Sequence, residues 1–334
     1  MQRNTFIAAL ALCSLMLPGT GIGQAAGQTA AQTGFPSRAV TLVSPFPAGS
    51  GSDLAARAVQ AGLSEALGQP VVVENRPGAG GAIGAQSVAK ARPDGYTLFL
   101  ASLSFSVLPS LMELNFDPAK DFQAVTLMGQ QGMAFVVPPS LPVKSMAELS
   151  ALAKSQPGKL NYASAGNGSI GHLAGELFKN EGTLDIVHVP FKGTPEALTA
   201  IMTGEVQMGL IAMPAAEAQI KAGKVKALAV TGTRRYAGLP DVPTLIESGL
   251  QSLSDSVWYA VLVPAGTPKD VVDKLNTAFR QALAKPATIE RLEGPAKTTP
   301  VASTPQEATD YVQSQIVKWN RVAAKAGLKP QANR

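Results

Sequence analysis

Short apolar runs alternate with amphipathic stretches along the first third of the chain. The apolar runs Ala39–Phe46, Pro70–Asn75 and Tyr96–Ser102 predict strands. Two stretches with apolar residues at helical spacing, Ser52–Gly68 and Gly80–Arg92, predict helices. The order strand, helix, strand, helix, strand is typical of a mostly parallel sheet covered by helices.

The middle of the chain repeats this alternation. Strands are predicted in the runs MAFVVPP, LNYASA, IVHVPF, MGLIAM and VKALAVT, with amphipathic helices between them. The apolar, proline-bounded segments Phe135–Pro142 and Trp258–Pro264 are candidates for strands that cross between two α/β units. We therefore expect an α/β fold with two domains, each a mostly parallel sheet flanked by helices. Residues 36–134 and 258–334 would form a discontinuous first domain, and residues 135–257 a second domain inserted in it.

The N-terminus has the pattern of a secretory signal peptide. Arg3 gives a positive start, and the apolar run Phe6–Leu17 that follows is too short to span a bilayer. We expect residues 1–25 to be removed and the mature protein to reside in the periplasm. Cys13 is the only cysteine and lies in this signal, so the mature chain has no thiol for a disulfide, a nucleophile or a metal site.

Charge and hydropathy argue against a nucleic-acid-binding or membrane-spanning protein, and the length bears on the number of domains. The net charge is +5 and no basic run is longer than Arg234-Arg235, so the sequence has no nucleic-acid footprint. No segment after the signal is apolar enough to cross a membrane. About 300 residues remain after the signal, which is long for one core and fits two domains.

Glycine and small hydroxyl residues gather in two loops, Ser44–Asp53 and Tyr162–His172, which each follow a predicted strand and lead into a predicted helix. Glycine lets backbone N–H groups approach a ligand, and the first turn of a helix leaves N–H groups unpaired beside a partial positive charge. Each loop taken alone is equally consistent with a tight turn and a helix cap. Two such loops at the carboxyl ends of strands, one from each α/β unit, predict a shared anion site. A third glycine loop, Glu74–Gly81, is better explained as a structural turn.

The second loop contains Gly166-x-Gly168-x-x-Gly171, the spacing of a dinucleotide-binding turn. Such a site needs an acidic residue at the end of the next strand. Asp185 has the right spacing, but it stands at the start of that strand. A G-K-[ST] phosphate loop is also absent from the sequence. We therefore interpret this loop as an anion cradle of another kind.

Catalytic chemistry has little support in the sequence. His172 and His188 are the only histidines, and we interpret both as structural residues. Without cysteine they are too few for a typical zinc site. Ser169 and His172 would be the nucleophile and base of a hydrolase, but no G-x-S-x-G surrounds Ser169. Asp117 and Asp121 resemble a surface turn more than paired catalytic carboxylates. We expect no catalytic residue, no metal and no cofactor.

Several long motifs occur in a fixed order: SPFPAGSGSD, VVVENRPGAGGAIGA, KARPDGYTLFLAS, NYASAGNGSIGHLAGELF, HVPFKGTPEAL, IKAGKVKALAVTGTRR and LPDVPTLIESGL. From Phe35 to Gly327 they resemble the tripartite tricarboxylate transporter substrate-binding proteins, the Bug receptor family. The resemblance implies a periplasmic two-domain clamshell, a type II solute-binding fold with two crossover strands. It also implies small organic acid ligands whose carboxylate is gripped between two strand–helix loops.

The resemblance places this grip on Phe46–Asp53 and Ser164–Ser169, the loops already reached from the residues alone. Asp53 would anchor the first helix turn or contact a donor on the ligand. Apolar Ile211–Met213 stand where the family usually has an acidic or polar residue, so they favour a carboxylate with a less polar body or belong to the core. Phe46 and Phe105 would line the ligand or pack in the domain. The predicted ligand-binding residues are Phe46, Ala48, Gly49, Ser50, Gly51, Ser52, Asp53, Ser104, Ser164, Gly166, Gly168, Ser169 and Met213.

The sequence therefore predicts an extracytoplasmic receptor that closes on a small organic carboxylate by hinge motion and delivers it to membrane permease subunits. We expect a monomer with no nucleic-acid partner. A sensor that reports the same ligand to a signalling membrane protein is the alternative, because both roles use the same fold. A periplasmic hydrolase is less favoured.

Overall fold

The computed structural model describes residues 34–254, 256–325 and 330. The chain divides into two units, Met1–Gly34 and Phe35–Arg334, and the architecture below belongs to the second unit. The predicted signal peptide, residues 1–25, lies outside the described residues. None of the helices in the described ranges combines the length and the apolar character that a bilayer crossing requires.

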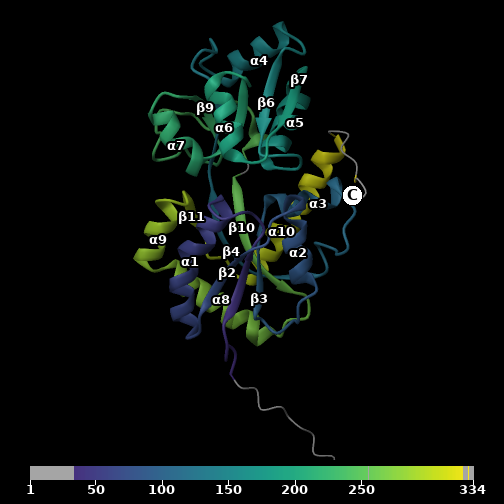
Figure 1. The fold of residues 1–334 in the computed structure, drawn as a ribbon, viewed down its shortest axis with the longest axis vertical. Helices are drawn as coiled ribbons and strands as arrows, with labels where there is room; N and C mark the ends of the chain where they lie inside the picture. The colour runs from purple at the N-terminus through teal and green to yellow at the C-terminus, as the bar shows by residue number, and fades with distance from the viewer. Residues whose placement is uncertain (1–33, 255, 326–329, 331–334) are drawn as a thin grey trace, which may run out of the picture. The chain divides into compact units, whose positions relative to one another are not determined.

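Six strands form the first sheet, in the order β11-β4-β10-β3-β1-β2. Figure 1 labels β2, β3, β4, β10 and β11 of this sheet. β1 pairs in parallel with β2 and β3, whereas β10 pairs antiparallel with β3 and β4, and β11 pairs antiparallel with β4. The strands are β1 (Val40–Ser44), β2 (Val71–Asn75), β3 (Thr97–Ser102), β4 (Phe122–Gln131), β10 (Val257–Pro264) and β11 (Thr298–Pro300).

The helices that belong to this sheet pack on it and on one another. α1 packs against α8, and α10 packs against α3 and β4. The helices are α1 (Gly51–Leu67), the 3-10 turn η1 (Ala79–Gly81), α2 (Ala82–Ala89), α3 (Leu103–Leu111), α8 (Lys269–Leu283), α9 (Pro286–Glu293) and α10 (Pro305–Lys325).

Five strands form the second sheet, in the order β7-β6-β8-β5-β9. β6 pairs in parallel with β7 and β8, whereas β5 pairs antiparallel with β8 and β9. The strands are β5 (Met133–Val137), β6 (Leu160–Ser164), β7 (Ile186–Pro190), β8 (Met208–Ala212) and β9 (Lys226–Val230). The helices are α4 (Met146–Ser155), α5 (Ile170–Gly182), α6 (Thr194–Thr203), α7 (Met213–Lys221) and the 3-10 turn η2 (Gln251–Leu253).

The two sheets confirm the α/β class, but they are mixed rather than mostly parallel. The antiparallel pairings arise largely where the chain passes between the sheets. It leaves the first sheet after β4, crosses at Gly132 into β5, and returns from β9 to β10. β5 and β10 therefore each enter a sheet against the direction of their neighbours.

β5 and β10 are buried along their whole length. Both lie in the interior of their sheets, where both faces are covered, and this explains why they appear in the sequence as unbroken apolar runs. Five elements were not anticipated, namely the strands β4 and β11, the helices α3 and α9, and the 3-10 turn η2. The helix predicted over Gly80–Arg92 is shorter, because Gly81 with φ 101° ends a 3-10 turn and the α-helix begins at Ala82.

Candidate functional site

Loop 1, residues 45–50, joins the carboxyl end of β1 to the N-terminus of α1. Ser50 is the N-cap of α1, and its Oγ accepts the backbone N–H of Asp53 at 3.3 Å. A serine in extended conformation before the first helical residue is among the favoured caps. Loop 1 therefore presents the positive end of a 17-residue helix at the edge of the first sheet.

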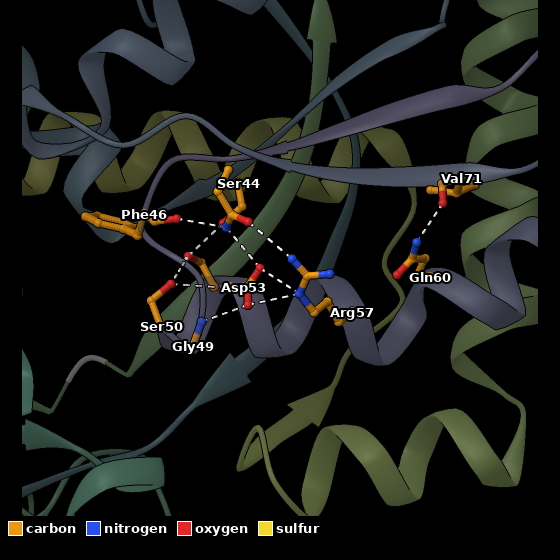
Figure 2. Close-up of polar contacts among 10 residues, drawn as sticks. Ser44, Phe46, Gly49, Ser50, Asp53, Arg57, Gln60 and Val71 are labelled. Carbon is orange, nitrogen blue, oxygen red and sulfur yellow. Dashed lines mark hydrogen bonds and ion pairs between the residues drawn. The ribbon is translucent and has the colours of Figure 1, made fainter.

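Asp53 is buried and holds loop 1 in place (Figure 2). Its carboxylate accepts the backbone N–H of Gly49 at 2.9 Å, Arg57 Nε at 2.9 and 3.0 Å, and Asn75 Nδ2 at 2.9 Å. Burial alone would raise the pKa of Asp53, but the hydrogen bonds from Arg57, Gly49 and Asn75 outweigh burial and lower the pKa below its usual value. Of the two roles expected for Asp53, the structure supports the anchor.

Asn75 ties this anchor to the rest of loop 1. Its Nδ2 also donates to the carbonyl of Phe46 at 3.0 Å, and its Oδ1 accepts Arg57 Nη2 at 3.2 Å. Sequence reasoning missed Arg57 and Asn75. Arg57 lies four residues after Asp53 on the same helix, and this spacing alone could have predicted the ion pair between them.

Three serine hydroxyls are linked by successive hydrogen bonds where β1 ends and α1 begins. Ser44 Oγ lies 3.1 Å from Ser52 Oγ, which lies 3.2 Å from Ser50 Oγ. Ser44 and Ser52 are almost fully buried. These hydroxyls are thus oriented by one another at the start of α1.

Gly51, the first residue of α1, lies against two buried polar side chains from neighbouring strands. A Cβ at Gly51 would lie 2.8 Å from both Gln131 Oε1 and Tyr259 Oη. Tyr259 Oη donates to Gln131 Oε1 at 3.2 Å, and Gln131 Nε2 donates to the Ala296 carbonyl at 2.7 Å. Only glycine lets α1 begin this close to β4 and β10.

Loop 2, residues 165–169, joins β6 to α5 in the second sheet. Ser169 is the N-cap of α5, and its Oγ accepts the backbone N–H of His172 at 3.4 Å. Ser164 Oγ accepts the N–H of Gly166 at 3.2 Å, and the N–H of Ser169 donates to the Gly166 carbonyl at 3.1 Å. Loop 2 thus resembles loop 1, since each follows a strand and ends in a serine that caps the next helix.

The two histidine rings form hydrogen bonds with loop 2 and with Ser164, which precedes it. The backbone N–H of Gly168 donates to His172 Nδ1 at 3.0 Å, and Ser164 Oγ lies 2.7 Å from His188 Nε2. The two rings stack with centroids 4.1 Å apart. Burial and the neighbouring His172 lower the pKa of His188 to about 4. Burial also lowers the pKa of His172, against the opposing effect of Glu176. Both histidines are structural, as predicted.

The hydrogen bonds within each loop decide which N–H groups are left for a ligand. In loop 1 those of Gly49 and Ser50 are taken, as is that of Asp53 in the first turn of α1. In loop 2 those of Gly166, Gly168 and Ser169 are taken. The first two N–H groups of each helix have no acceptor among the described residues: Gly51 and Ser52 in α1, and Ile170 and Gly171 in α5. Pairs of N–H groups at a helix N-terminus bind anions.

The remaining predicted site residues lie in different surroundings. Ala48 is exposed and Phe46 is half-buried, both in loop 1. Ser104 is buried near the start of α3, where its Oγ lies 3.0 Å from Ser102 Oγ. Phe105 packs edge-on against Phe122 in the core. Met213 and Ile211 are buried in the core of the second sheet and are explained as core, whereas Ala212 between them is half-buried.

The geometry supports neither a dinucleotide site nor a serine hydrolase. Asp185 directly precedes β7, so it stands at the end of the strand opposite to loop 2, as predicted. Ser169 Oγ bonds the backbone of His172 and not its ring, which is occupied by Gly168. In the described part of the chain, no group of three or more histidine, cysteine, aspartate or glutamate side chains is placed to hold a metal ion.

Two mixed α/β sheets joined by two crossings of the chain, at Gly132 and between β9 and β10, with glycine-rich loops at helix N-termini in both sheets, define a solute-binding protein. The family model of the tripartite tricarboxylate transporter family receptor matches residues 55–328. The chain belongs to this family.

Known proteins resemble the chain over most of its length. The protein BugT of Bordetella pertussis is 34% identical over 326 residues, which cover 96% of this chain and 98% of that protein. A solved R. palustris structure with adipate is 35% identical, with a TM-score of 0.80, and covers 89% of this chain and 100% of its own. MatC from Rhodopseudomonas palustris with bound malate is 34% identical, with a TM-score of 0.77, and covers 86% and 100%.

Proposed function

We propose that this protein is a periplasmic receptor that binds a small organic carboxylate between loop 1 and loop 2 and delivers it to the permease of a tripartite transporter. One observation carries this function: each loop ends at a helix N-terminus whose first two N–H groups have no acceptor among the described residues. A carboxylate has two oxygens, each of which accepts such donors, and the helix dipoles favour its negative charge.

The two sheets act as two domains that close on the ligand. One domain carries β1–β4, β10 and β11 and the other carries β5–β9, and the chain crosses between them at Gly132 and between β9 and β10. The boundaries expected from the sequence therefore shift, because Met133 and Ala134 belong to the second domain and Val257 to the first. A hinge at these crossings brings the two loops together when a ligand bridges them, because the closed state then gains contacts that the open state lacks. The receptor acts as a monomer and carries out no catalysis.

The ligand is a dicarboxylate of the size class of malate and adipate. Two relatives with about one third of their residues identical to this chain were solved with these acids. Two loops with equivalent donors suit either one carboxylate held from both sides or two carboxylates held separately. The buried Met213 leaves the loops, rather than the end of β8, as the source of selectivity.

A thermal-shift panel tests the function. Malate, adipate and the corresponding uncharged diamides are added to the purified mature protein at matched concentrations. At 100 times its dissociation constant a ligand adds about 2.7 kcal/mol to the free energy of unfolding. We expect at least one of the acids to raise the melting temperature and both diamides to leave it unchanged. Stabilisation by the diamides alone would exclude a carboxylate receptor.

A further inference from the structure

His172 is the residue that fixes the position of Gly168 in loop 2. The Gly168 N–H is a donor, so His172 Nδ1 must be the unprotonated nitrogen of a neutral ring. Gly168 itself has φ 76°, and a Cβ there would clash with Leu111. The segment between β6 and α5 therefore depends on a glycine that only one side-chain acceptor, the ring of His172, holds in place.

Three titratable groups lie close to His172. His188 on β7 stacks on it at 4.1 Å, Glu176 lies one turn along α5, and Tyr162 on β6 stacks on His188 at 4.8 Å. The hydroxyl of Tyr162 donates to Glu176 Oε1 at 2.6 Å and to the His172 carbonyl at 3.4 Å. His172 is 8% exposed, so a charge on its ring has little access to water.

We infer that His172 is a positioning residue that keeps loop 2 ready for a carboxylate only while its ring is neutral, so that acidification releases both the loop and the ligand. This inference rests on the function proposed above. It adds a pH-dependent step to ligand binding that is separate from the titration of the ligand.

The two imidazoles respond differently to a proton. A protonated His188 still bonds Ser164, because Nε2–H can donate to the hydroxyl while the hydroxyl donates to the Gly166 carbonyl. A protonated His172 sets Nδ1–H against the Gly168 N–H, so two donors face each other and the bond is lost. The stacked arrangement also opposes a charge on both rings. Protonation of His172 is therefore the event that releases Gly168.

Two substitutions separate the hydrogen bond from the bulk of the ring. His172→Asn places an amide oxygen near the position of Nδ1 and does not titrate, whereas His172→Gln places its amide near Nε2 and leaves Gly168 without an acceptor. Malate or adipate affinity is measured by calorimetry from pH 8 to pH 5 in the wild type and both variants. The titration of the ligand is common to all three proteins and cancels in the comparison.

We expect His172→Asn to match the wild type at pH 8 and to lose less affinity on acidification. We expect His172→Gln to bind about tenfold more weakly at pH 8, the effect of one hydrogen bond. Equal affinities and equal pH profiles in all three folded proteins would overturn the inference.

A measurement without ligand separates this inference from the proposed function. Hydrogen exchange of the Gly168 amide, followed by NMR, should show protection in the wild type at pH 8 that falls on acidification and is retained in His172→Asn. A wild type that binds neither acid while showing this protection pattern would contradict the carboxylate function and support the control of loop 2 by His172. An amide that is unprotected at pH 8 would overturn the role of His172, whatever the ligand.

Discussion

The carboxylate of Asp53 accepts the backbone N–H of Gly49 over 2.9 Å and so ties the first turn of α1 back to loop 1. Asp53→Asn replaces one acceptor oxygen by an NH2 group, which cannot accept a hydrogen bond, so the donors that face this position, Arg57 together with either Gly49 or Asn75, lose this acceptor. We expect the free energy of unfolding to fall by about 1.5–3 kcal/mol, the range for a buried hydrogen bond to a charged group. Urea unfolding at pH 7 measures this loss.

Asp273→Asn is the matched control for Asp53→Asn. Asp273 pairs with Lys269 on the exposed face of α8, with about half of its side chain exposed, and exposed pairs contribute about 0–1 kcal/mol. A loss at position 53 no larger than the loss at position 273 would mean that Asp53 does not anchor loop 1.

The close approach of Gly51 to Gln131 and Tyr259 gives a second prediction. Gly51→Ala would place a Cβ 2.8 Å from Gln131 Oε1 and Tyr259 Oη, and overpacking of this kind costs about 1–3 kcal/mol. Removing one neighbour should relieve the clash, so the substitution should cost less in a Gln131→Ala background. A double-mutant cycle by chemical unfolding measures this coupling. Purely additive effects would argue against a steric limit at Gly51.

The low pKa of His188 predicts a stability that depends on pH. An unfolded histidine titrates near pH 6.5, whereas His188 titrates at about 4 in the folded protein. Between these values the unfolded chain binds more protons, so stability is complete above about pH 6.5 and falls as the pH drops toward 4.

His188→Gln isolates this contribution, because an amide near the position of Nε2 can still bond Ser164 and does not titrate. Unfolding free energies at pH 7.5 and pH 5.0 should differ less in this variant than in the wild type, with the remaining difference supplied partly by His172. An identical difference in both proteins would contradict the buried, neutral state of His188.

Much of the fold was predictable because apolar periodicity reports burial directly. The strands β1 and β6 and the helix α1 each fall within about two residues of the expected bounds, as pattern reasoning allows. β4 was missed because its sequence, FQAVTLMGQQ, mixes apolar and polar residues without a clean alternation. The mixed pairing of the sheets was missed because strand direction depends on where the chain crosses, which a local pattern does not encode.

The candidate site was predictable as two loops but not as individual donors. Glycine and serine near a strand end pointed to the loops Ser44–Asp53 and Tyr162–His172. The sequence did not reveal that Gly168 donates to His172, or that Ser169 donates within its own loop, because both bonds depend on the folded path of the backbone. In the proposed grip the ligand donors therefore shift from Gly168 and Ser169 to Ile170 and Gly171.

The N–H of Ile170 tests the carboxylate grip most directly. Proline is tolerated at the first position of a helix, and Ser169 before it already has the extended conformation that a following proline requires. Ile170→Pro therefore removes one ligand donor without removing a bond inside the protein. Ile170→Ala is the matched control, because it loses the same side chain and keeps the N–H.

Calorimetric titration of the two variants with the acid that stabilises the wild type tests whether the Ile170 N–H binds the carboxylate. The account predicts that Ile170→Pro binds this carboxylate about tenfold or more weakly than Ile170→Ala, the loss of one hydrogen bond to a charged group. Equal affinity in two folded variants would contradict a carboxylate held at the N-terminus of α5.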